Sequence, residues 1–203
     1  CTQIKLNMKL DTILSGVGGQ GILSIATIIG EAALNEGLHI KQSEVHGMSQ
    51  RGGEVQSHLR ISSDVIHSDL ISQKSADAII SLEPMEALRY TSYLAPEAWV
   101  VSNSAPFVNI PNYPDIKVVI DELSALPRVI LINIDSLAKE AGSLRTANML
   151  LLGAASPILK IEQSKLEDAI DRVFSRKGKE VVEMNIKAFR IGREAGMVQI
   201  QQA

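Results

Sequence analysis

A glycine-rich segment near the start of the chain constrains its fold more than any other feature. Residues 16–21 read Gly-Val-Gly-Gly-Gln-Gly and follow an apolar stretch, Lys9 to Ser15, that predicts a strand. Gly21 to Asn35 then carries apolar residues near helical spacing, and Gly37 stands where such a helix would end. A strand, a glycine turn and a helix in this order predict the first unit of an α/β protein.

The rest of the chain predicts a three-layer α/β/α fold with a mostly parallel sheet, a Rossmann-like first β-loop-α unit and a helical C-terminal third. Strand-like and helix-like segments alternate from residue 9 to residue 142, and the chain is helical from about residue 143. The expected strands are Lys9–Ser15, Leu38–Gln42, Val55–Ile61, Ala78–Leu82, Trp99–Ser102 and Val129–Ile134. The expected helices are Gly21–Asn35, Pro84–Tyr93, one capped by Asp135 and ending at Ala141, the apolar stretch Arg145–Leu152, Glu162–Phe174 and Lys179–Glu194. Irregular connections are expected at Ser43–Gly53 and Asn103–Pro114.

One domain is expected over residues 9–195, because 203 residues suit a single core and no repeat or long linker divides the chain. Residues 1–8 are interpreted as an N-terminal extension or as residues added to the natural chain, since Met8 could be an initiator. Residues 196–203 are expected to be a tail.

Composition argues against several classes of function. The formal net charge of -3 gives no electrostatic basis for binding nucleic acid over a broad surface. No apolar run reaches the roughly 18 to 20 residues of a membrane-spanning helix. We therefore expect a cytoplasmic protein with neither a nucleic-acid nor a membrane partner.

The sequence also shows no metal or redox centre. Cys1 is the only cysteine, whereas an iron–sulfur cluster needs about four thiolates. The four histidines have no metal-ligand spacing, and no serine stands in a nucleophile elbow. We assign this chain no metal ligand and no catalytic residue.

The first glycine loop supports two interpretations. Glycines let the backbone approach a cofactor phosphate, and the N–H groups of a helix's first turn attract an anion. The same glycines could instead serve only a tight turn and close packing. A nicotinamide site would further need an acid closing the second strand; Glu44 is the only candidate, and no helix is expected after it. The candidate cofactor-binding residues are Gly16, Gly18, Gly19, Gln20 and Gly21.

A second glycine-rich loop lies between two expected strands and reads His-Gly-Met-Ser-Gln-Arg-Gly-Gly over residues 46–53. Its arginine offers a planar fork of donors suited to phosphate or carboxylate, and its paired glycines allow tight folding. An anion site or an interface loop is predicted, with pairing of the arginine to a nearby acid as the alternative. The candidates here are His46, Gln50, Arg51, Gly52 and Gly53.

Taken together, four parts of the chain resemble the gamma-type subunit family of 2-oxoacid:ferredoxin oxidoreductases, and above all its indolepyruvate beta-subunit branch. They are the Gly16–Gly21 loop, Gly47–Gly53 with the strand Val55–Ile61, Ser75-Ala76-Asp77 leading into Ala78–Glu83, and Asn148–Gly153. The resemblance spans about residues 9–195. It implies that an arylpyruvate, coenzyme A (CoA) and oxidised ferredoxin give an aryl-acetyl-CoA, carbon dioxide and reduced ferredoxin.

The resemblance also implies thiamine diphosphate, Mg and 4Fe-4S clusters. This sequence has neither cluster cysteines nor a Gly-Asp-Gly thiamine signature, so those cofactors are expected on a larger partner subunit, through which ferredoxin is reached. The isolated chain is expected to be inactive, as a monomer or a homodimer. Three functions stay open: a subunit that supplies part of a shared CoA site, a purely structural interaction module, and a stand-alone NAD(P)-dependent oxidoreductase.

Overall fold

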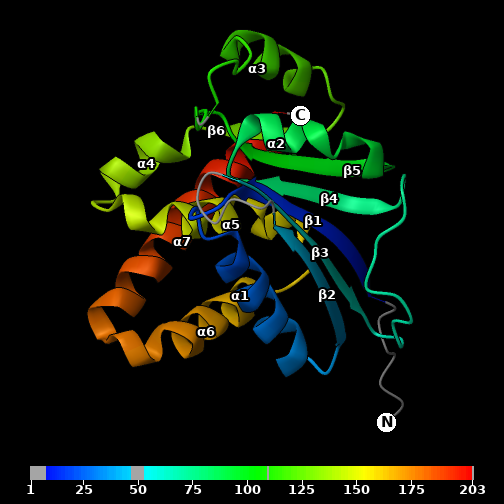
Figure 1. Ribbon diagram of the computed structural model, residues 1–203. Coiled ribbons are helices and arrows are strands. Elements are labelled where there is room, and N and C mark those ends of the chain that lie inside the picture. The colour runs from blue at the N-terminus through cyan, green and yellow to red at the C-terminus, as the bar shows by residue number, and fades with distance from the viewer. Residues whose placement is uncertain (1–7, 47–52, 109, 203) are drawn as a thin grey trace.

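The computed structural model describes residues 8–46, 53–108 and 110–202, with His46 described in its backbone alone. Within them a six-stranded sheet lies between two layers of helices (Figure 1). The strands are β1 (Lys9–Val17), β2 (His39–His46), β3 (Glu54–Ser62), β4 (Ala76–Ser81), β5 (Leu94–Asn103) and β6 (Val129–Ile132). The α-helices are α1 (Ile22–Asn35), α2 (Pro84–Arg89), α3 (Ile116–Ser124), α4 (Ile134–Glu140), α5 (Ala147–Ala155), α6 (Gln163–Phe174) and α7 (Lys179–Ile200). Single 3-10 turns lie at Thr91–Tyr93, Leu144–Thr146, Ser156–Ile158 and Ser175–Lys177.

The sheet has the strand order β2-β3-β1-β4-β5-β6 and is mixed. β1, β4, β5 and β6 pair in parallel, whereas β3 is antiparallel to both β1 and β2. The α/β class is confirmed, and the expectation of parallel strands is corrected at β3. The reason is the connection: residues 47–53 alone join β2 to β3, and a parallel crossover needs about a dozen residues or more.

Each face of the sheet has its own core, because successive side chains of a strand point to opposite faces. Leu14 of β1 packs with α1, α5, α6 and α7, and Ile13 packs with α2 and α3. Figure 1 shows these helix layers on either side of the strands. The glycine loop therefore begins on a strand buried on both faces and ends in a helix buried along one side.

Several elements differ from the sequence-based expectation: β5 begins at Leu94 and not at Trp99, and α2 ends at Arg89 and not at Tyr93. Residues 43–46 extend β2 and are not part of a loop. α3 follows the proline-rich connection, with Asp115 accepting a hydrogen bond from the Lys117 N–H at its start. Asn133, not Asp135, caps α4 by accepting from the Ser136 N–H at 2.9 Å. α7 continues to Ile200, so the expected tail is mostly helical.

The end of α7 is fixed to the sheet. The side chain of Gln199 accepts from the Leu131 N–H at 2.8 Å and donates to the Leu131 carbonyl at 2.5 Å. It thereby occupies the hydrogen-bonding groups of β6, an edge strand, as a neighbouring strand would. No helix among the described residues is long and apolar enough to cross a lipid bilayer.

Candidate functional site

The first glycine loop lies where the chain direction reverses across the sheet. From β1 the chain passes through α1 to β2 on one side, and it later returns to β4 on the other side of β1. α/β proteins bind ligands in the crevice at such a switch point, beyond the carboxyl ends of the strands. The predicted location of the site thus agrees with the topology.

Two of the loop's N–H groups are free to bind a ligand. The Gly18 N–H donates to the carbonyl of Gly53 at 2.8 Å, and the Gln20 N–H donates to that of Val17 at 3.1 Å. Gly19 and Gly21 have φ angles of 101° and 85°, in the left-handed region that favours glycine. Their N–H groups find no acceptor among the described residues, and they are the donors that an anion could use.

The side chain of Gln20 makes two hydrogen bonds within the fold. Its Oε1 accepts from the Val17 N–H at 2.7 Å, and its Nε2 donates to the Leu82 carbonyl at 3.2 Å. Leu82 directly follows β4, so this one side chain ties the end of β1 to the end of β4. These two bonds give Gln20 a structural role in the loop, and its predicted part in cofactor binding stays a prediction.

The glycines of the loop differ in what an added side chain would contact, which bears on whether the loop serves packing or ligand binding. A methyl group on Gly16 would lie 2.8 Å from Oε1 of Gln20, and one on Gly21 would lie 2.8 Å from Nδ2 of Asn148. A methyl group on Gly19 would meet nothing within 4 Å. A side chain at Gly16 or Gly21 would therefore displace Gln20 or Asn148 from its present position, whereas Gly19 borders open space where a ligand could approach.

This contrast gives a prediction about stability. Gly19→Ala is expected to lower the free energy of unfolding by about 1 to 2 kcal/mol, the strain of a side chain at positive φ. Gly21→Ala should lower it by about 1 to 3 kcal/mol more, because the added methyl group also displaces Asn148. Urea denaturation of the two purified variants measures the difference, and equal losses would contradict the packing role of Gly21.

A cavity of about 350 Å³ opens beside the loop. Arg145 is exposed on its wall and takes part in none of the ion pairs formed by the described residues. Asp135 contributes one carboxylate to the same wall. The lining residues are Gly19, Gln20, Gly21, Leu82, Asn103, Asp135, Leu144, Arg145, Ala147 and Asn148.

Two asparagines set the shape of this cavity. Asn103, at the end of β5, accepts from the N–H groups of Ala105 and Ile134 through Oδ1. Asn148, in the first turn of α5, donates to the Gly21 carbonyl at 3.3 Å. The cavity is thus built from the carboxyl ends of the strands and from the start of α5.

A second hollow of about 280 Å³ lies beside the same loop and is mostly apolar. It is lined by Val17, Gly18, Gly19, Gly21, Ile22, Leu23 and Val55. Gly19 and Gly21 border both spaces. A ligand with a charged part and an apolar part could therefore contact both sides of the loop.

The predicted second loop is largely outside the described residues. Gly47 to Gly52, including Gln50, Arg51 and Gly52, are not described, and neither is the side chain of His46. Gly53 is described, and its carbonyl accepts the N–H of Gly18. The structure thus brings the end of the second loop against the first.

Sequence reasoning missed Arg145, Asn103 and Asn148 as candidate residues. They stand 82 to 127 positions beyond Gly21, so their approach depends on long-range packing. A polar Asn103 directly after the buried strand segment Trp99–Ser102 was the one usable signal, because buried polar side chains are normally hydrogen-bonded.

The sheet order removes the basis for a nicotinamide site. Glu44 lies in β2, where it pairs with Ser57 of β3. β3 separates β2 from β1, which places the acid about two strand spacings, roughly 10 Å, from the strand that carries the glycine loop. In a dinucleotide-binding fold those two strands are neighbours.

Two buried carboxylates, Glu83 and Glu86, follow the cavity residue Leu82 in the chain. Glu83, directly after Leu82, accepts hydrogen bonds from the N–H of Glu86 and the hydroxyl of Tyr113. Burial raises the pKa of Glu86, against the opposing effect of its hydrogen bonds with Arg89. Burial also raises the pKa of Tyr113. Among the described residues no group of three His, Cys, Asp or Glu side chains could hold a metal ion.

Fold and site together define a three-layer α/β protein with a candidate anion site at the switch point of its sheet. The sequence matches the family described as Pyruvate ferredoxin/flavodoxin oxidoreductase over residues 11–195, and the chain belongs to this family. It is 37% identical to "Indolepyruvate oxidoreductase subunit IorB" of Archaeoglobus fulgidus, over 91% of this chain and 94% of the relative.

Solved structures share the fold. The keto/oxoacid ferredoxin oxidoreductase gamma subunit from Geobacter sulfurreducens is 26% identical, with a TM-score of 0.66 over 93% of this chain and 99% of that one. The 2-oxoglutarate:ferredoxin oxidoreductase from Magnetococcus marinus is 24% identical, with a TM-score of 0.75 over 94% of this chain. This chain spans 31% of that longer chain. The recognition of a gamma-type subunit from sequence is confirmed.

Proposed function

We propose that this chain is the small subunit of an indolepyruvate:ferredoxin oxidoreductase and supplies part of the CoA site of the assembled enzyme. The family match supports the oxidoreductase class, and the name of the relative at 37% identity supports indolepyruvate. In this reaction an arylpyruvate loses carbon dioxide, its acyl group is transferred to the CoA thiol, and the two electrons released reduce ferredoxin.

We assign the cofactors to the partner. When bound there, thiamine diphosphate with Mg supplies the carbanion chemistry of decarboxylation, and 4Fe-4S clusters carry the electrons. The residues of this chain do not fit either group. The sequence has one cysteine, and the described residues offer no cluster of metal-ligating side chains.

The observation that carries the CoA assignment is the 350 Å³ cavity beside the loop. Its wall combines the N–H groups of Gly19 and Gly21, which find no acceptor among the described residues, with the exposed side chain of Arg145. Backbone N–H groups at a helix start and an arginine fork are both suited to phosphate oxygens. CoA has phosphates to place there and an apolar arm that could lie along the second hollow beside Val17 and Leu23.

Arg145→Ala is expected to raise the apparent KM for CoA of the assembled enzyme by about ten- to a hundredfold. The physical reason is the loss of a charge-assisted hydrogen bond worth about 1.5 to 3 kcal/mol. Steady-state assays with varied CoA at saturating indolepyruvate measure the effect. Arg176→Ala is the matched control, because that arginine is exposed at the turn between α6 and α7.

Arg51→Ala tests the second loop in the same assay. An unchanged KM for CoA in both variants would reject the CoA assignment. If the variants instead weaken assembly, while residual complex keeps its CoA affinity, the chain acts as a structural module. Size-exclusion chromatography of the co-expressed subunits distinguishes these results.

The indolepyruvate assignment is checked by measuring kcat/KM of the complex for indolepyruvate and for 2-oxoglutarate, and a higher value for indolepyruvate is expected.

A further inference from the structure

Residues 63–75 join the C-terminal end of β3 to the N-terminal end of β4, at the end of these strands that is far from the glycine loop. The segment contains neither helix nor strand. Ile66 and Ile71 are buried, whereas Val65 and Leu70 are 63% and 55% exposed. A cavity of about 340 Å³ lies between this segment and the sheet, bordered by Arg60 and His67. Hydrogen bonds hold the segment near its ends, where the Ser63 N–H donates to the Met8 carbonyl and the Lys74 N–H to the Ser92 carbonyl. Lys41 also donates to the His67 carbonyl at 3.4 Å. Two further attachments hold its middle.

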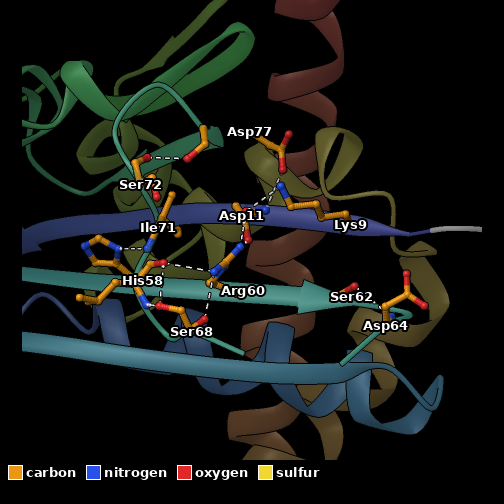
Figure 2. A network of polar contacts seen from close by, with 12 residues as sticks. Lys9, Asp11, His58, Arg60, Ser62, Asp64, Ser68, Ile71, Ser72 and Asp77 are labelled. Carbon is orange, nitrogen blue, oxygen red and sulfur yellow. Dashed lines mark hydrogen bonds and ion pairs between the residues drawn. The ribbon is translucent and has the colours of Figure 1, made fainter. Parts of the chain in front are cut away.

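Arg60 of β3 provides the first attachment. Its Nη1 donates to the carbonyls of Ser68 at 3.0 Å and Leu70 at 3.1 Å. Its Nε and Nη2 bind the buried carboxylate of Asp11 at 2.8 and 3.0 Å. Figure 2 shows this arginine between β1 and the segment. The pair fixes the middle of the segment to two strands.

His58, two residues earlier on the same strand, provides the second attachment. Its Nδ1 accepts the N–H of Ile71 at 2.9 Å (Figure 2). A backbone N–H can only donate, so Nδ1 carries no proton and the ring is neutral with its proton on Nε2. The amide Nε2 of Gln56 is placed 2.8 Å from Nε2 of His58. Two N–H donors cannot bond to each other, so with the proton on His58 Nε2 the Gln56 amide is turned over and its oxygen accepts there. This bond to Ile71 therefore exists in only one protonation state of His58.

The surroundings of His58 favour that neutral state. Burial lowers its pKa, Arg60 lowers it further, and Asp69 of the segment opposes them. The ring of Tyr93 packs edge-on against the imidazole, with centroids 5.4 Å apart. Asp69, Arg60 and Tyr93 are the ionisable groups that face the ring from the segment, the strand and the turn before β5.

We propose that His58 is a proton-controlled catch for residues 63–75: protonation of Nδ1 removes the acceptor of the Ile71 N–H and releases the segment from the sheet. Arg60 keeps its two carbonyl partners, so the release is local and centred on Ile71. A buried histidine beside a weakly packed segment has the geometry of a pH switch.

The direction of the pH dependence follows from proton linkage. In the released segment His58 is solvated and has an ordinary pKa of about 6.5, whereas in the attached segment its pKa is lower. Between the lowered pKa of the attached state and about pH 6.5, the released state binds a proton that the attached state does not. In this range the equilibrium constant for release of the segment rises by up to about tenfold for each unit by which the pH falls. Above this range the constant does not depend on pH.

Amide hydrogen exchange of the full chain, followed by NMR from about pH 7.5 to about pH 5, tests the proposal. After correction for intrinsic exchange, the opening constant of the Ile71 amide should rise on acidification with a slope approaching tenfold per pH unit. Amides in the middle of α7 report global unfolding, which also solvates His58 and is linked to the same proton. The opening constant of the Ile71 amide should therefore exceed theirs at every pH, and equal constants would mean that Ile71 exchanges only by global unfolding and would overturn the proposal. A pH-independent Ile71 amide would overturn the proposal.

Two variants separate the effect of the His58 ring from that of other titrating groups. His58→Asn places a carbonyl oxygen close to the position of Nδ1, cannot titrate in this range, and should keep Ile71 protected at every pH. His67→Asn is the matched control, because that histidine is exposed on the same segment; it should retain the wild-type slope. The wild-type slope in His58→Asn would refute the catch. If that variant does not fold, nitrogen NMR of the wild-type ring decides, since a proton on Nδ1 at neutral pH excludes the proposal.

Discussion

Gly192→Ala is expected to lower the free energy of unfolding by about 2 kcal/mol or more, among the largest effects of a single methyl group in this chain. Gly192 lies in α7, and a methyl group there would overlap the carbonyl oxygen of Leu150 in α5. Gly153 of α5 is crowded in the same way by the backbone of Phe189. The two helices therefore touch along their backbones and cannot separate without opening the core around Leu150 and Phe189.

Urea denaturation checks this prediction, with Gly30→Ala as the matched control. Gly30 also lies inside a helix, α1, but its added methyl group would meet only Cδ1 of Ile40, at an ordinary 3.7 Å. That variant should be neutral or up to about 1 kcal/mol more stable, since alanine favours helix more than glycine does. Similar losses in the two variants would show that the backbone contact is not the cause.

The same contact reaches the candidate site. α5 carries Asn148, whose side chain donates to the carbonyl of Gly21. A shift of α5 away from α7 would move Asn148 relative to the glycine loop. Gly192→Ala should therefore also disturb the cavity, although Gly192 is not among its lining residues.

Local signals predicted the parts of the fold that are determined locally. The apolar run before Gly16, the glycines and the periodic apolar residues after them define β1, the loop and α1 with small boundary errors. Pro84 correctly indicated the start of α2, where Glu83 accepts the Glu86 N–H. Each of these features depends on residues within a few positions of one another.

For other parts of the fold, neighbouring residues in the sequence favour different structures or different boundaries. Ile116, Val119 and Leu123 lie at helical spacing behind Asp115, yet the sequence-based expectation ends an irregular connection at Pro114 and assigns no helix after it. Asn133 and Asp135 are both good helix caps, and the choice between them follows from where β6 ends. The direction of β3 was implied by the short connection from β2, which sequence periodicity alone does not weigh.

The sequence indicated where the candidate site lies, but it did not indicate which residues line the cavity. The glycine pattern located the loop, but Gln20 faces inward because Val17 and Leu82 offer it a donor and an acceptor. Arg145 and Asn103 reach the cavity only because β5 and the turn before α5 end at the same edge of the sheet. Such long-range approach has no local signature in one sequence.

Arg60→Met is expected to lower the free energy of unfolding by about 3 kcal/mol. The substitution retains much of the side-chain volume but leaves the Asp11 carboxylate, 2% exposed, without its bidentate partner. Lys9 remains 3.1 Å from that carboxylate, but it is 59% exposed and compensates weakly. The carbonyls of Ser68 and Leu70 also lose their donor.

Arg128→Met is the matched control for Arg60→Met in urea denaturation. Arg128 is 41% exposed and its partner Glu97 is 76% exposed, so breaking that pair should cost less than about 1 kcal/mol. Adding Asp11→Leu to Arg60→Met should restore part of the loss, because the unpaired buried charge is then gone. No difference between the two arginine variants would mean that the Asp11 pair contributes no more than a surface contact. Since Arg60 also lowers the pKa of His58, its removal should bring the pKa of the attached state closer to that of the released state and so reduce the total rise of the Ile71 opening constant on acidification.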